Sequence, residues 1–199
     1  VAVSETPAGK YSFYGYVHDI NGMRLGERAD DQPQFDPAVI AEGDKVYLYS
    51  GFCGPGDKSR KGAMVTVLAP DMLTIIEEPV IIVPGNCYGG GTGFEGHEFF
   101  EAPSIRKHDD TYYFVYSSIQ MHELCYATSV NPTKDFTYRG VIVSNCDENI
   151  TSHKPARMHT YVPGNNHGGM AEVLGQWYIF YHRHTNGTNF SRQGCAEPI

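Results

Sequence analysis

Two carboxylates of the sequence stand in similar short motifs. Asp36 lies in Phe-Asp-Pro-Ala and Glu101 lies in Phe-Glu-Ala-Pro. Paired carboxyl groups are used in glycoside hydrolysis, in which a carboxylic acid protonates the leaving oxygen and a carboxylate activates water. Asp-Pro is also a common opening of a surface turn, so the motifs alone leave both interpretations open.

Two further polar side chains are candidates for binding. His167 lies in Asn-Asn-His-Gly-Gly (residues 165–169), and Arg192 follows Phe-Ser. A histidine in that place could contact a substrate or an ion, or be an ordinary loop residue. An arginine could hold a sugar hydroxyl or carboxylate, although most arginines lie on the solvated surface. A Gly-x-Gly-x-x-Gly pattern at residues 91–96 is followed by no helical pattern, so we expect a loop there and not a dinucleotide site.

The elements that must position these residues repeat along the chain. Tyr49, Tyr116 and Tyr181 occupy the same place in three segments, so the repeat is 67 and then 65 residues long. Each segment contains a short strand, a polar turn and an aromatic strand, which is a β-hairpin signal. We expect hairpins at residues 36–50, 101–117 and 169–181.

Each repeat carries about four strands, which is the content of one blade of a β-propeller. The additional strands are expected at residues 63–68, 80–83, 124–128 and 141–144. Starts of the innermost strands face the central channel of a propeller, and Asp36, Glu101 and His167 share this phase. We therefore expect these three side chains to converge on one pocket.

Composition favours an all-β class and excludes several kinds of function. The 199 residues include 14 Tyr, 22 Gly and 12 Pro, which suits short strands and tight turns. The net charge of −8 argues against a nucleic-acid partner, and no apolar run is long enough to cross a membrane. The five cysteines show no Cys-x-x-Cys spacing and are expected to be free thiols, although one or two disulfides would suit an exported protein.

The motifs, in their order and spacing, resemble the family 43 glycoside hydrolases, which are five-bladed β-propellers acting on arabinose- and xylose-containing glycans. The segments that carry the resemblance are Phe35–Ala38, His97–Lys107, Asn165–Gly169, Gly175–His184 and Phe190–Ile199. The resemblance implies an inverting α-L-arabinofuranosidase or β-xylosidase with a carbohydrate substrate. It implies no organic cofactor, but a calcium ion in the channel.

The resemblance also implies a role for each candidate residue. Glu101 looks like the general acid, and Asp36 looks like the third carboxylate, which orients that acid. His167 looks like the channel histidine near the calcium ion or its water shell, and so the expected metal contact. Arg192 looks like the arginine that contacts the substrate.

One expected residue has no match. The family's general base is an Asp at the start of the first blade, and the early Asp19 is badly spaced for that place. Closed propellers typically have four to eight blades, whereas the repeat accounts for three. We therefore expect residues 1–199 to be a partial propeller domain, its N-terminal blades belonging to the same chain or to a partner chain.

Three functional interpretations remain open at this point. The first is an inverting glycosidase, the second is a non-catalytic carbohydrate-binding propeller without the base, and the third is another propeller glycosidase such as a fructosidase or sialidase relative. No signal peptide is visible, so a cytoplasmic or a secreted bacterial protein would both suit the sequence.

Overall fold

The computed structural model describes residues 1–148, 161–164 and 166–199. These residues are almost entirely β-strand and loop, and their one helical segment is the 3₁₀ helix η1 (Asn86–Tyr88). The strands are β1 (Ala2–Val3), β2 (Ser12–Phe13), β3 (Ala38–Glu42), β4 (Lys45–Ser50), β5 (Gly62–Leu68), β6 (Ile75–Pro84), β7 (Phe99–His108), β8 (Thr111–Ser118), β9 (Glu123–Ser129), β10 (Thr137–Ser144), β11 (Gly168–Val173), β12 (Gln176–His184) and β13 (Arg192–Pro198).

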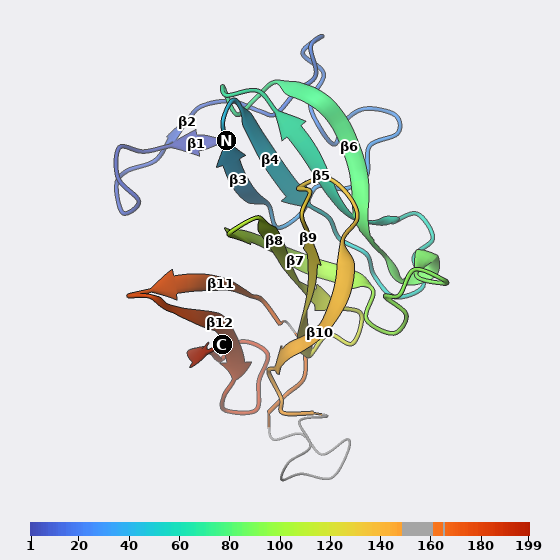
Figure 1. Ribbon diagram of the computed structural model, residues 1–199, viewed down its shortest axis with the longest axis vertical. Coiled ribbons are helices and arrows are strands. Elements are labelled where there is room, and N and C mark those ends of the chain that lie inside the picture. Colours follow the sequence, from blue (N-terminus) through green and yellow to red (C-terminus); the bar gives the residue numbers. More distant parts are fainter. Residues whose placement is uncertain (149–160, 165) are drawn as a thin grey trace.

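Three antiparallel sheets follow one another along the chain (Figure 1). The first has the order β3-β4-β5-β6, the second β7-β8-β9-β10 and the third β11-β12-β13, while β1 and β2 form a separate pair. The first strand of the second sheet, β7, contacts both β3 and β11, the first strands of its neighbours. The predicted blades are therefore confirmed, with their inner strands side by side.

The three predicted hairpins are β3–β4, β7–β8 and β11–β12. The turn of β11–β12 is formed by Leu174 and Gly175, with φ angles of 52° and 82°. A two-residue hairpin turn of this hand needs positive φ at both central positions. The strands expected at residues 80–83 and 141–144 extend further, as β6 and β10, because irregularities in their pairing let them continue past a local break.

Hydrophobic clusters fill the spaces between the sheets. One joins the first and second sheets and includes the fully buried Tyr49, Phe114 and Tyr116. Another joins the second and third sheets around Leu124 and Ile179. Within the described residues, no helix has the length and hydropathy needed to cross a bilayer.

Candidate active site

Asp36 and Glu101 lie at the same end of neighbouring inner strands. Asp36 precedes β3, as expected, and has a φ of 47°. Glu101 lies inside β7 and not before it, because β7 begins at Phe99, which pairs with Ser118. The pairing is then interrupted after Glu101, where Ala102 has a φ of 62°. This bulge changes the direction of the acid's side chain at the channel.

His167 reaches the two carboxylates because the strand that follows it lies unusually close to β7. Gly168 and Gly169 begin β11, and a β-carbon on Gly169 would lie 2.5 Å from Ser104 Oγ in β7. A β-carbon on Gly168 would lie 2.4 Å from the carbonyl oxygen of Phe180. The missing side chain of Gly169 thus allows the approach to β7, and that of Gly168 allows the close approach to β12. Asn165, the first residue of the motif, lies outside the described residues.

The three side chains converge, as the repeat predicts. His167 Nε2 lies 3.1 Å from Glu101 Oε1 and 3.8 Å from Asp36 Oδ2. One ligand atom from each of the three residues lies within 4.8 Å of the others. The Glu101 side chain is 11% exposed, while Asp36 and His167 are 27% and 38% exposed. The site is thus a partly open cluster with its carboxylates recessed.

Burial and neighbouring charge alter the protonation of this cluster. Burial raises the pKa of Asp36, the His167 charge opposes this, and the Glu101 charge adds to it. The hydrogen bond to Glu101 is the main cause that raises the pKa of His167, against the effect of burial. Imidazolium is therefore favoured beside the two carboxyl groups.

Arg192 begins β13 and pairs in register with His184 of β12. It is exposed, and its positive charge acts on His167, whose pKa it lowers slightly against the larger effect of Glu101. The structure thus places Arg192 near the three-residue cluster.

Two histidines of β12 continue the row of imidazole rings that begins at His167. Alternation along β12 puts His182 and His184 on the same face, and their ring centroids are 5.5 Å apart. The His167 and His182 ring centroids are 6.3 Å apart. His184 is buried, and its Nδ1 lies 3.0 Å from the carbonyl oxygen of Val162.

Aromatic rings flank the carboxylates. Phe35 and Phe100 directly precede Asp36 and Glu101, and Phe52 lies between them, with ring centroids 5.5 Å from Phe35 and 5.3 Å from Phe100. The rings remove the acid from water on one side, and Phe35 remains 47% exposed. An apolar surface beside recessed carboxyl groups suits a sugar-sized ligand.

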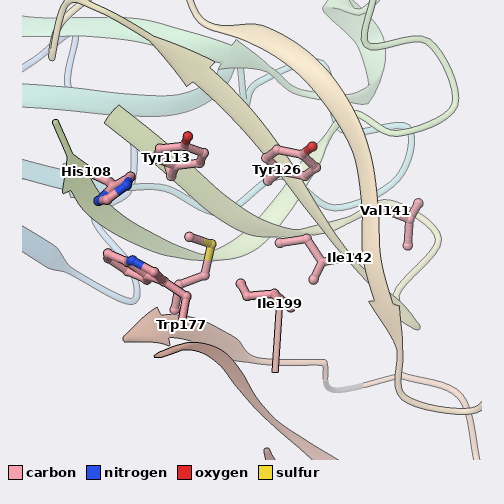
Figure 2. A pocket seen from close by; sticks show the side chains of 8 residues that line it. His108, Tyr113, Tyr126, Val141, Ile142, Trp177 and Ile199 are labelled. Atoms are coloured by element: carbon pink, nitrogen blue, oxygen red, sulfur yellow. The ribbon is translucent and has the colours of Figure 1, made fainter. Parts of the chain in front are cut away.

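A separate cavity of about 420 Å³ opens between the second and third sheets (Figure 2). Its lining, within the described residues, contains no carboxylate and is mostly apolar. The lining residues are His108, Tyr113, Tyr126, Val141, Ile142, Met170, Trp177 and Ile199. The carboxyl side chains that are candidates for acid chemistry therefore lie in the channel cluster and not in this cavity.

The sequence profile of Glycosyl hydrolases family 43 matches residues 1–199. The chain belongs to this family. It is 71% identical to a xylosidase/arabinosidase of Thermoclostridium stercorarium over all 199 residues, which are 42% of that protein. It is 29% identical to a xylosidase/arabinosidase of Bacteroides ovatus over 87% of this chain and 61% of that protein. The chain thus spans less than two thirds of these relatives.

A solved family 43 structure has the same arrangement of strands. It is a β-xylosidase/α-arabinofuranosidase from a compost microbial metagenome, in complex with xylotriose and in a calcium-free form. Its TM-score is 0.69 at 25% identity, over 99% of this chain and 60% of that chain. The predicted all-β propeller class is confirmed by this likeness and by the three sheets of the family 43 chain.

Sequence reasoning missed two other clusters in this family 43 chain. The Glu123 cluster consists of His97, Glu123 and Cys125, and the Cys146 cluster consists of His122, Cys146 and Glu148. Alternation along β9 is the signal that could have paired Glu123 with Cys125. All five cysteines are free thiols in the structure.

Proposed function

We propose that this chain carries the acid side of the active site of an inverting glycoside hydrolase. Its substrates would be arabinose- or xylose-containing plant polysaccharides or oligosaccharides, in an α-L-arabinofuranosidase or β-xylosidase reaction. Family membership and the names of the relatives support the class of reaction. The convergence of Asp36, Glu101 and His167 from three successive blades is the observation that carries the proposal.

Glu101 is the residue suited to donate the proton to the leaving oxygen. It is the most recessed of the three side chains, and its Oε1 lies 3.1 Å from His167 Nε2. Arg192, on β13 of the third sheet, supplies positive charge for a substrate hydroxyl.

Asp36 acts as a positioning residue and not as the base. An inverting pair needs about 6.5–9.5 Å between its carboxyl groups, to leave room for the attacking water. The facing oxygens of Asp36 and Glu101 lie within 4.8 Å of each other, with the His167 imidazole in contact with both. Asp36 thus orients His167 and Glu101, and its charge sets their electrostatic environment.

The general base would come from outside these three strand starts. We infer that further blades, from the same chain or from a partner chain, complete the channel and supply this carboxylate. The 42% share of the Thermoclostridium stercorarium relative that this chain spans supports the inference.

We also infer that the channel suits a calcium ion near His167. Asp36 Oδ2 is buried and, within the described residues, has no hydrogen-bond partner. A carboxylate oxygen is a ligand that calcium prefers, and waters would complete a coordination of 6–8 oxygens. Asp36 would hold the ion directly or through water, and His167 would contact its water shell. When bound, such an ion would supply fixed positive charge beside the carboxylates.

The test uses the full-length protein with arabinoxylan oligosaccharides and with aryl arabinofuranoside and xyloside substrates. Hydrolysis that releases the sugar with inverted anomeric configuration, seen by NMR at early times, is the expected result. Retained configuration would overturn the inverting assignment.

A non-catalytic carbohydrate-binding propeller is the second candidate. It is favoured by one observation: within the described part of the chain, the carboxylates that pair with His167 are too close together to include an inverting base. Saturable oligosaccharide binding by the full-length protein, without hydrolysis, would establish this alternative in place of the enzyme.

A further inference from the structure

The Cys146 cluster lies at the end of the second sheet that carries Glu101. Glu101 pairs with Ser117, and Ser117 pairs with Leu124, so these residues form one row across the sheet. His122 directly precedes β9, and Cys146 and Glu148 follow β10. The cluster shares no residue with the channel site.

The cluster gathers three side chains with different metal-binding atoms. The residues His122, Cys146 and Glu148 each offer one ligand atom, and the three atoms lie within 4.8 Å of one another. His122 Nε2 is 3.9 Å from Glu148 Oε2. His122 and Cys146 are buried, while the Glu148 side chain is 23% exposed. An ion at the centre would thus have two recessed ligands and one beside solvent.

The surrounding structure fixes the histidine ring. His122 Nδ1 lies 3.0 Å from the buried Ser144 Oγ. When Nδ1–H donates to that oxygen, Nε2 directs its lone pair toward Glu148. Histidine ligands of metals are usually oriented in this way, by a hydrogen bond from the other ring nitrogen.

The backbone also holds the two ligand segments together. The amide of Asn145 donates to the carbonyl oxygen of His122 over 2.8 Å. The Asn145 side chain donates to the carbonyl oxygen of Gly164, and Asp147 pairs with Arg183 at 2.6 Å. The ligand positions are therefore anchored to β9, β10 and the third sheet before any ion binds.

We propose that His122, Cys146 and Glu148 bind one divalent transition-metal ion of the zinc class, with water in the fourth position. Thiolate, imidazole and carboxylate are the three ligand types that zinc takes, in tetrahedral sites with bond lengths of about 2.0–2.3 Å. Such bonds place neighbouring ligands about 3.3–3.7 Å apart, so the 3.9 Å contact needs only a small rotation of Glu148. The sulfur selects against calcium and magnesium, which prefer oxygen.

The Glu123 cluster is a weaker candidate, although it has the same residue types. Glu123 Oε1 already accepts hydrogen bonds from Ser118 Oγ and Cys125 Sγ and contacts His97 Nδ1 at 2.6 Å. Burial raises the pKa of the Cys125 thiol. Burial acts in the same sense on Cys146, but the hydrogen bonds with His122, Ser144 and the Glu148 backbone and the His122 charge together lower its pKa. To bind an ion through Oε1, Glu123 would have to give up these three contacts.

Cobalt titration of the metal-stripped, full-length protein tests the proposal. Cobalt bound to sulfur shows a thiolate-to-metal charge-transfer absorption, whereas the channel site of Asp36, Glu101 and His167 offers no sulfur. We expect this absorption to saturate at one cobalt ion per chain, and zinc to displace it. Its absence at saturating cobalt would overturn the proposal.

Variants assign the absorption to its ligands. Cys146→Ser should abolish it, Glu148→Gln should weaken cobalt binding, and Ser144→Ala should weaken binding by about 10–100-fold. The controls Cys125→Ser and Cys195→Ser should leave it unchanged. Absorption that persists in Cys146→Ser, or that only Cys125→Ser removes, would overturn the assignment. Glu148 is partly exposed, so its variant is expected to fold, and the melting curves of metal-free proteins check this.

Discussion

The His167–Glu101 pair and the His97–Glu123 pair each join a histidine to a glutamate, but the two carboxylates differ in how many hydrogen-bond donors surround them. His97 Nδ1 contacts Glu123 Oε1 at 2.6 Å, and that oxygen also accepts from Ser118 and Cys125. The Glu123 side chain is 5% exposed, and His97 stacks on Tyr138 with ring centroids 4.9 Å apart. The three side chains that contact Glu123 Oε1 can each donate a hydrogen bond to the carboxylate.

The channel pair is less completely satisfied. Glu101 contacts His167 at 3.1 Å, and a second carboxylate, Asp36, contacts the same ring nitrogen. Asp36 Oδ2 has no hydrogen-bond partner within the described residues. Two acidic groups share one imidazole, so there is unused capacity to bind a substrate or an ion. A saturated carboxylate stabilises the fold, whereas an unsaturated one next to an open channel is available for chemistry.

Glu101→Gln should have the largest effect, and on activity. The amide keeps the shape but carries no transferable proton, and general acid catalysis contributes about 10²–10⁴-fold. The loss should be of this size for an alkyl glycoside and much smaller for an aryl glycoside with an acidic phenol, which leaves without protonation. The measurement is kcat/KM for both substrates on the full-length protein.

Glu172→Gln, an exposed change on β11, is the matched control and should keep full activity. Equal losses on both leaving groups in Glu101→Gln would show that Glu101 is not the acid.

Glu123→Ala should instead lower the free energy of unfolding, by about 2–4 kcal/mol. It leaves the buried Ser118 hydroxyl and Cys125 thiol without their acceptor, and an unsatisfied buried polar group costs about 1–3 kcal/mol. Denaturant unfolding measures the change, and activity well below the melting temperature should stay within a few-fold. Glu123→Gln, which keeps an acceptor oxygen, should cost less. A Glu123→Ala variant that kept its stability but had a strongly reduced kcat would contradict this prediction, because it would place the His97–Glu123 pair in catalysis as well.

Asp36→Asn should separate activity from stability. Its activity should fall by less than the about 10²-fold lower limit for the acid itself. Burial raises the pKa of Asp36, so in the wild type the ionised form reduces stability as pH rises through the folded-state pKa. The asparagine variant should therefore gain stability relative to wild type as pH rises above about 4, the ordinary pKa of an aspartate. Melting temperatures of the variant and the wild type that differ by the same amount at every pH would contradict this prediction. They would show that the Asp36 carboxylate, like that of Glu123, has enough hydrogen-bond partners in the folded protein.

Cys125→Ala should have the smallest effect, about 1 kcal/mol in unfolding free energy, because it removes one weak donor and leaves a small void. Glu123 keeps Ser118 and His97 as partners, so activity should be unchanged. A loss of several kcal/mol would mean that the thiol, and not the hydroxyl, holds the carboxylate in place.

The repeat spacing was enough to predict the hairpins and the convergence of the channel residues. Tyrosines at 67- and 65-residue intervals fixed the phase, and strand starts in one phase meet at the channel. The bulge at Ala102 could not be foreseen, because it depends on how Phe99 pairs with Ser118. The contact between His97 and Glu123 could not be predicted either, because it depends on the path of the turn between β8 and β9.

The Cys146 cluster was beyond sequence reasoning for a similar reason. Its residues lie in a turn and in a segment after β10, where no periodic pattern places side chains. The general base is a different case. The family resemblance implies an Asp for this role, and no position of residues 1–199 matches it.

The missing side chain of Gly169 determines how closely β11 can approach β7 at the candidate active site. Ser104, which it touches, belongs to the strand that carries Glu101, and Gly169 stands two residues after His167. One methyl group at Gly169 would act as a spacer between the two strands, since its carbon would lie 2.5 Å from Ser104 Oγ. A side chain at Gly169 would require Ser104 Oγ or the two strands to move, and His167 now meets Glu101 at 3.1 Å. The missing side chain of Gly169 thus helps to keep the two strands at the separation at which this contact forms.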